Sequence, residues 1–306
     1  MSALYTDDEL TQWKPMLEKD AREILKYVIE PQLKVPSREL LQGSKLEFPL
    51  RGPKYGDPFE YSANFSERRM TIPILSMKFL RDLIYADLWL QYNDYSTVTT
   101  SLYLTMLKYR EAAEFPGGRY PPPLSSLRIP ESAPGVPKEE GAFVSERARL
   151  VYRNALIFLL AHETGHLVLR HEGSSVENEK QADVFAIQIM GSAEAIPSGL
   201  IKFFTFANYW VENRADFDTE LGYQAKLFRS PHPLTGERVL VVGVMLSTRP
   251  EIFFPSLPDT DERVQLTKQV GFRLIDLAKS MDNLNRQVGF REIGRDMNLS
   301  GLAPRR

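Results

Sequence analysis

The 306-residue sequence contains no cysteine and only four histidines. Without cysteine no disulfide can stabilise the fold and no disulfide-linked partner can form, which is typical of proteins of the reducing cytoplasm. Long apolar runs are also missing, because the longest, 155–161 and 239–246, fall far short of the ~20 residues that span a bilayer. Residues 1–10 are acidic and lack the apolar core of a signal peptide. We therefore expect a soluble, cytoplasmic protein without a membrane partner.

Neither sign of charge dominates the sequence, which has a formal net charge of −2 at pH 7. A nucleic-acid-binding domain usually carries a basic patch, so nucleic acid is not an expected partner. The 43% of hydrophobic residues can build a large core, either as one extended domain or as two intimate lobes.

The four histidines concentrate around one short motif. His162 and His166 frame the string H-E-T-G-H, His171 follows closely, and His232 lies between two prolines. Histidines four apart on a helix project from one face and can bind the same ion, while Glu163 can address a metal-bound water. The motif predicts a zinc site, with Zn²⁺ as the cofactor and a peptide or protein as the substrate.

The flanking sequence indicates a helix that carries this motif. Ser145 can cap it, residues 146–170 contain no proline and no glycine but Gly165, and Gly173 can end it. The wholly apolar run 155–161 predicts that this helix is central and buried on most sides. The alternative is two ordinary core histidines without a metal.

A hydrolytic zinc ion usually takes three protein ligands, so a third is needed. His171 is a poor candidate: if the helix continues through it, its side chain is rotated by about 140° from His166. Leu169 and Glu172 also stand where the metzincin pattern requires Gly and His. We interpret His171 as a partly exposed residue at the helix C-terminus, favourable to the helix dipole.

The next predicted helix offers a better third ligand. Ser174 and Glu177 can form a capping box, and the apolar pattern runs from residue 176 to Gly191. Glu179 and Asp183 share a face of it, so Glu179 can reach the ion and Asp183 can orient a histidine ring. Alternatively, these carboxylates only form a solvated acidic first turn.

These motifs resemble the gluzincin zinc peptidases, with the CAAX prenyl protease group as the nearest pattern. That group shares H-E-x-x-H, an E-x-x-A-D block on the next helix and a later His-Pro followed by Arg. The resemblance implies that His162, His166 and Glu179 are the zinc ligands, that Glu163 is the general base and acid, and that Asp183 orients a ligand. It also implies that His232 lies at the open side of the metal and that Arg238 matches the arginine of the family pattern.

Many members of that group are integral membrane proteins, unlike this sequence. A second, looser resemblance is to the soluble Lit-like phage-exclusion peptidases, which share the same blocks and have a strand and an aromatic helix before the zinc helix. Here these would be residues 69–75 and 77–91. The Lit-like substrate is not carried over, because no substrate contact can be matched to a residue of this sequence.

The expected mechanism is attack of a zinc-activated water on a peptide carbonyl, with Glu163 taking the proton. His232 could stabilise the oxyanion, or it could merely order a loop, and Tyr209 or Tyr223 are weaker substitutes. Arg238 could pair with Asp183 or another acid near the site, or remain a surface charge.

The fold class predicted is α+β, mainly helical and zincin-like (gluzincin), with a small sheet upstream of the H-E-x-x-H helix. Residues 33–58 read as irregular, and 59–65 with 69–75 as a hairpin whose second strand is an edge because it contains Pro73. Further helices are predicted at 6–30, 77–92, 96–114, 197–211, 217–228, 234–246 and 260–285. We expect a first part of the catalytic unit (1–115), a Pro-rich surface segment (116–144) and a zinc-bearing helical part (145–306).

A rival function is a catalytically inactive zinc-binding scaffold or regulatory protein that binds a protein partner. Glu163 argues against it, because this carboxylate is not needed to hold the ion. A glutamine variant at this position separates the two functions.

Overall fold

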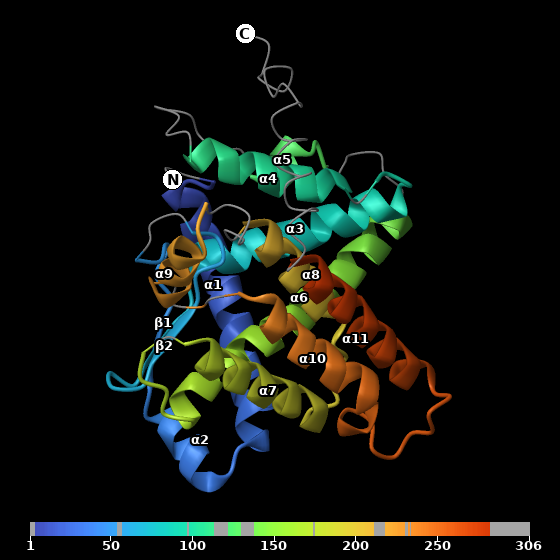
Figure 1. Cartoon of the computed structure of the whole chain (residues 1–306). Coiled ribbons are helices and arrows are strands. Elements are labelled where there is room, and N and C mark those ends of the chain that lie inside the picture. Colours follow the sequence, from blue (N-terminus) through green and yellow to red (C-terminus); the bar gives the residue numbers. More distant parts are fainter. Residues whose placement is uncertain are drawn as a thin grey trace.

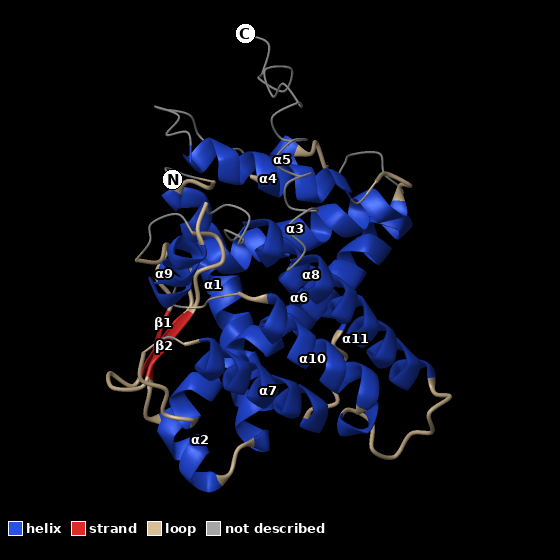
Figure 2. Ribbon diagram, in the orientation of Figure 1, coloured by secondary structure: helices blue, strands red, loops and turns tan. Residues whose placement is uncertain are grey.

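The computed structural model describes residues 4–53, 57–96, 98–112, 122–129, 138–173, 175–210, 218–229, 232 and 234–281. These residues are mainly helical, with one small three-stranded sheet at one side (Figure 2). The predicted class, a mainly helical α+β protein with a small sheet before the histidine motif, is therefore confirmed.

The N-terminal helix α1 spans Asp7–Ile24 and begins with a capping box. The Thr6 hydroxyl accepts a hydrogen bond from the Glu9 backbone, and the Glu9 carboxylate accepts one from the Thr6 backbone. Pro15 lies inside the helix. The chain continues through a π-helical turn at Leu25–Ile29 and a 3₁₀ turn at Glu30–Gln32.

The prediction that residues 33–58 are irregular is wrong in part. They contain helix α2 (Val35–Gln42) and strand β1 (Lys45–Glu47). Pro36 stands in the first turn of α2, where its missing N–H costs nothing, and Gly43 follows its last residue. Pro36 and Gly43 therefore mark the two ends of a short helix. In the sequence alone they indicate an irregular segment.

The sheet has the order β1-β3-β2, with β2 at Ser62–Asn64 and β3 at Arg69–Thr71. β2 and β3 pair antiparallel, which confirms the hairpin. The edge position predicted for the second strand is wrong, because β1 pairs parallel with the other side of β3. Pro73 did not prevent this, since it lies beyond β3 as the N-cap of α3.

The remaining helices follow in the order expected, except for the short helix α5, which lies in the Pro-rich segment where no regular element was predicted. They are α3 (Ile74–Tyr92), α4 (Val98–Ala112), α5 (Pro123–Ser126), α6 (Lys138–Val168), α7 (Val176–Ser192), α8 (Ser198–Trp210), α9 (Glu220–Arg229), α10 (Gly236–Thr248) and α11 (Glu262–Met281). Figure 1 shows α6 running through the middle of the molecule, and α10 and α11 lying side by side.

Helix α6 packs against α3, α7 and α8, and its segment 155–161 is buried throughout, as predicted. Its start is not as predicted, because it begins at Lys138 and passes through Ser145. A residue that can cap the N-terminus of a helix does not start a new helix when the residues before it are themselves helical.

Part of the Pro-rich segment 116–144 is packed rather than free. Leu124 and Ile129, in and after α5, are buried against Ala86 and Leu90 of α3. Residues 113–121 and 130–137 lie outside the described residues. The division into parts 1–115, 116–144 and 145–306 stays a prediction, although one core cluster includes side chains from both sides of the segment.

Among the described residues, no helix combines the length and apolarity that crossing a membrane requires.

Candidate metal centre

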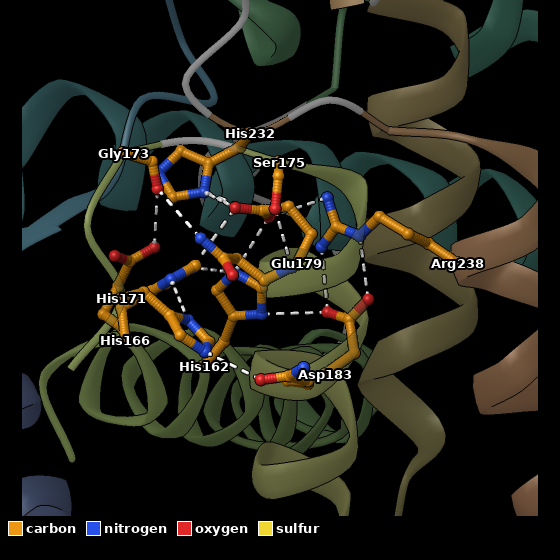
Figure 3. A network of polar contacts seen from close by, with 12 residues as sticks. His162, His166, His171, Gly173, Ser175, Glu179, Asp183, His232 and Arg238 are labelled. Carbon is orange, nitrogen blue, oxygen red and sulfur yellow. Dashed lines mark hydrogen bonds and ion pairs between the residues drawn. The ribbon is translucent and has the colours of Figure 1, made fainter. Parts of the chain in front are cut away.

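The two histidines of the motif lie on one face of the last turns of α6 and are buried. The Nε2 atoms of His162 and His166 are 3.0 Å apart, as the four-residue spacing predicts (Figure 3). Glu163, the next residue, is buried as well, and its Oε2 has no hydrogen-bond partner among the described residues.

Helix α7 brings Glu179 to the same point. Its N-cap is Ser175, whose hydroxyl accepts a hydrogen bond from the Asn178 backbone, one residue after the predicted cap. Ser174 lies outside the described residues. The Glu179 carboxylate is fully buried, with Oε2 3.2 Å from Nε2 of His162 and Oε1 3.3 Å from Nε2 of His166. The solvated acidic turn is therefore ruled out for Glu179.

A glycine inside the motif allows the two helices to approach. A Cβ at Gly165 would lie 3.2 Å from the Cα of Ala182 and 3.1 Å from the ring of Phe185, both on α7. These distances are tighter than ordinary van der Waals contact, so a larger residue would push α7, and with it Glu179, away from α6.

His232 joins the cluster from the segment before α10. Its Nδ1 lies 3.2 Å from Oε2 and 3.2 Å from Oε1 of Glu179, and its Nε2 lies 3.8 Å from Oε1 of Glu163. One potential ligand atom from each of His162, His166, Glu179 and His232 lies within 4.8 Å of all the others. These four residues could hold a metal ion.

Arg238 of α10 holds the acidic side chains of α7 in place. It donates two hydrogen bonds to Asp183, from Nε to Oδ2 (2.8 Å) and from Nη2 to Oδ1 (2.9 Å). Its Nη1 lies 2.9 Å from Oε2 of Glu179, and Oδ1 of Asp183 lies 2.8 Å from Nδ1 of His162. All four side chains are buried, so water screens these charges little.

The buried carboxylates of the cluster stabilise positive charge on the groups that surround them. Burial alone would lower the pKa of His162, but the carboxylates of Asp183 and Glu179 outweigh burial and raise it to about 10. Burial raises the pKa of Glu179, yet the positive groups of His232 and Arg238 and its histidine contacts hold it well below the usual range. Either a proton on an imidazole or a bound divalent cation would compensate the negative charge of these buried carboxylates.

The tautomers that the contacts favour also fit a cation. If Nδ1 of His162 donates to Asp183 and Nδ1 of His166 donates to His171, both Nε2 atoms present lone pairs to one point. Two lone pairs 3.0 Å apart repel unless a cation lies between them. Two imidazoles and one carboxylate are a common ligand set of hydrolytic zinc.

His171 is partly exposed and lies just after the C-terminus of α6, as predicted, but the orientation expected for its side chain, away from His166, is wrong. Helix α6 does not continue through this residue, because Arg170 adopts a left-handed backbone with φ of 60°. The backbone N–H of His171 donates to the His166 carbonyl and that of Arg170 to the Leu167 carbonyl, which is a Schellman cap. The chain turns back, and Nδ1 of His171 lies 2.9 Å from Nδ1 of His166 (Figure 3).

Sequence reasoning missed several residues around the cluster. Gln181, whose Oε1 lies 3.2 Å from Nε2 of His171, could be noticed only once that turn was known. Tyr61 lines a pocket beside Glu163, and neither Tyr209 nor Tyr223 is among the described residues of that lining. No local signal pointed to Tyr61, which lies about a hundred residues before the motif.

Comparison with known proteins supports a peptidase. The model of the family described as Peptidase U49 matches residues 123–210, less than a third of the chain. The match includes α6 and α7 with the histidine motif, Glu179 and Asp183, and it ends before His232 and Arg238. No curated protein and no solved structure matches.

Proposed function

We propose that this protein is a zinc-dependent metallopeptidase of the gluzincin type with a zincin-like catalytic core. Ligands His162, His166 and Glu179 hold the ion in this proposal. The observation that carries it is the convergence of their Nε2 and carboxylate atoms within 3.3 Å. Beside them lies the buried Oε2 of Glu163, which has no hydrogen-bond partner among the residues that the structure describes.

A zinc ion held by these residues would lower the pKa of a bound water and polarise the substrate carbonyl. Glu163 is the general base that takes the proton of the attacking water, and it then delivers this proton to the leaving amine. The free Oε2 of Glu163 suits this role, since no hydrogen bond in the described part of the chain competes for its lone pairs.

His232 is proposed to donate a hydrogen bond to the oxyanion of the tetrahedral intermediate. Its Nδ1 is directed at Glu179, which leaves Nε2 as the nitrogen nearer to Glu163. A donor fixed in a buried site stabilises developing charge more strongly than a donor in water. The competing role is that of a fourth ligand, because the ring lies within the same cluster.

Asp183 and Arg238 are proposed as positioning residues. Oδ1 of Asp183 lies 2.8 Å from Nδ1 of His162, and this contact favours the ring orientation with Nε2 toward the ion. Arg238 fixes the carboxylates of both Asp183 and Glu179, and thus couples the two helices α7 and α10 at the site.

The proposed substrate is a protein or peptide in extended conformation. Strand β2 is an outer strand of the sheet and packs near α6. An extended chain can pair with the free edge of such a strand through backbone hydrogen bonds. The outer strand proposed for substrate pairing is therefore β2, at residues 62–64, and not the strand at residues 69–75 that was expected to form an edge of the sheet.

The test is a Glu163→Gln variant compared with the wild type on a proteome-derived peptide library, with zinc content measured by mass spectrometry. We expect Glu163→Gln to keep one zinc ion per chain and the wild-type circular dichroism, and to lose cleavage by a factor of about 10² or more. A wild type that binds zinc but cleaves nothing supports the inactive scaffold instead. Unchanged cleavage by Glu163→Gln excludes Glu163 as the base.

The same assay separates the two roles of His232. We expect His232→Ala to retain stoichiometric zinc while kcat falls by about 10². Loss of zinc from this variant would make His232 a ligand rather than an oxyanion donor.

A further inference from the structure

A small pocket opens directly beside the proposed catalytic base. Its volume is about 70 Å³, and its lining includes His162, Glu163 and His232. The apolar part of the lining, here called the apolar wall, includes Phe59, Phe158, Phe203, Ala207 and Leu234. A group bound in this pocket would therefore belong to the part of a substrate that lies next to the reacting atoms.

The apolar wall is preformed by packed aromatic rings. The ring of Phe203 lies 6.3 Å from that of Phe59 and 6.1 Å from that of Phe158, and Phe59 also packs edge-on against Phe79 at 5.6 Å. Rings locked against one another in this way resist rearrangement. The size of the pocket is then a selective feature.

This size limits the occupant. An aromatic ring needs a cavity of about 150 Å³, and one water molecule has a share of about 30 Å³ in the liquid. The pocket therefore takes roughly two to three non-hydrogen atoms, which corresponds to the side chain of serine, threonine or valine.

The lining contains one polar group that the metal cluster does not use. Tyr61 is 3% exposed, and its hydroxyl is buried without a hydrogen-bond partner among the described residues. Burial and then the neighbouring Tyr152 and Glu163 raise the pKa of Tyr61 well above its ordinary value, so it stays a neutral phenol that can donate and accept. Buried hydroxyls are normally paired, and an unpaired one beside an active site fits a ligand that carries the missing partner.

We propose that this pocket binds the side chain of the substrate residue next to the scissile bond, and that it selects a small hydroxyl side chain, threonine or serine, whose oxygen pairs with the Tyr61 hydroxyl. The methyl group of threonine packs against the apolar wall, and its hydroxyl meets the one polar group of the described lining that does not belong to the metal cluster. The inference rests on the proposed peptidase function and names its preferred substrate class.

The test uses a peptide that the wild type cleaves and that carries threonine next to the scissile bond, together with its valine counterpart of nearly equal shape. The ratio of kcat/KM for the threonine and valine peptides is measured for the wild type and for Tyr61→Phe. We expect this ratio to fall at least about fivefold in Tyr61→Phe, because the threonine hydroxyl would then be buried without a partner. The melting temperature of Tyr61→Phe should not decrease, because the lost hydroxyl makes no hydrogen bond within the described part of the protein.

Tyr152→Phe is the matched control. Tyr152 is also a buried tyrosine whose hydroxyl lacks a partner among the described residues, but it does not line the pocket. We expect it to leave the threonine-to-valine ratio as in the wild type.

Each other outcome overturns the inference in a recognisable way. If Tyr61→Phe slows both peptides equally, Tyr61 acts through Glu163 and selects nothing. If cleaved peptides carry aromatic or charged residues on both sides of the bond, the pocket is not the subsite. If the wild type binds zinc and cleaves no peptide, the proposed function fails first, and the inference fails with it.

Discussion

At the scale of single residues, His171 contacts the ring of His166 at Nδ1, the nitrogen that does not face His162. Nδ1 of His171 lies within hydrogen-bond distance of Nδ1 of His166, on the side of the His166 ring opposite to its Nε2. The other ring nitrogen of His171, Nε2, contacts the side chain of Gln181. A histidine ligand is usually oriented by such a partner, and loss of the partner costs about 10- to 100-fold in metal affinity.

We therefore expect His171→Ala to weaken zinc binding by about 10- to 100-fold, measured by competition with a chelator of known affinity. The fold should persist, because His171 lies outside the core. The control is Glu172→Ala, at the adjacent exposed position, which should bind zinc as the wild type does. Equal affinity of His171→Ala and wild type would show that the contact does not orient His166.

Most of the candidate site could be predicted at this scale because it depends on helix periodicity. His162 and His166 share a face by their spacing, and so do Glu179 and Asp183, and a short turn makes the two helices neighbours. The position of His171 depends on the left-handed backbone of Arg170, a conformation that sequence assigns readily to glycine but not to arginine.

At the scale of elements, the site depends on how closely α6 can be approached by its neighbours. Gly165 permits the contact with α7, and Gly199 permits the contact with α8. A Cβ at Gly199 would lie 2.3 Å from the backbone N of Ala155 and 2.5 Å from the carbonyl O of Val151. Backbone atoms cannot swing aside as a flexible side chain can.

Gly199→Ala should therefore separate α8 from α6 and lower the free energy of unfolding by about 1–3 kcal/mol or more. Urea denaturation followed by circular dichroism measures this change. Gly173→Ala is the comparison, since its added Cβ meets nothing within 4 Å and only its φ of 75° is unfavourable, at a cost of about 1 kcal/mol. A smaller effect at position 199 than at 173 would contradict the packing argument.

The element boundaries show where sequence signals compete. Ser145 is a good N-cap residue, but α6 begins earlier. Pro36 and Gly43 suggest an irregular segment, although Pro36 lies in the first turn of α2 and Gly43 follows its last residue. The parallel pairing of β1 with β3 depends on a long-range contact that no periodicity encodes. Short strands are decided by such partners rather than by intrinsic preference.

At the scale of the whole molecule, the candidate metal centre joins parts of the chain that are distant in sequence. His166 comes from α6, Glu179 from α7 and His232 from the segment before α10. Arg238, in α10 itself, also contacts Glu179. A single core cluster of buried side chains extends from α1 to α11. An ion at this point would therefore bind the folded chain and not the unfolded one, which makes metal binding a contribution to global stability.

Removal of metal should lower the stability of the wild type by a predictable amount. Zinc at 100 times its dissociation constant stabilises the folded state by about 2.7 kcal/mol, which raises the melting temperature by roughly 4 °C in a chain of this size. We expect scanning calorimetry to detect this rise when zinc is added to EDTA-treated protein. Glu179→Ala should respond far less, because a ligand is missing and the buried positive charge of Arg238 then keeps only one of its two carboxylate partners, Asp183. If zinc shifts both proteins equally, the ion binds elsewhere, and the convergence of α6 and α7 on this point has another cause.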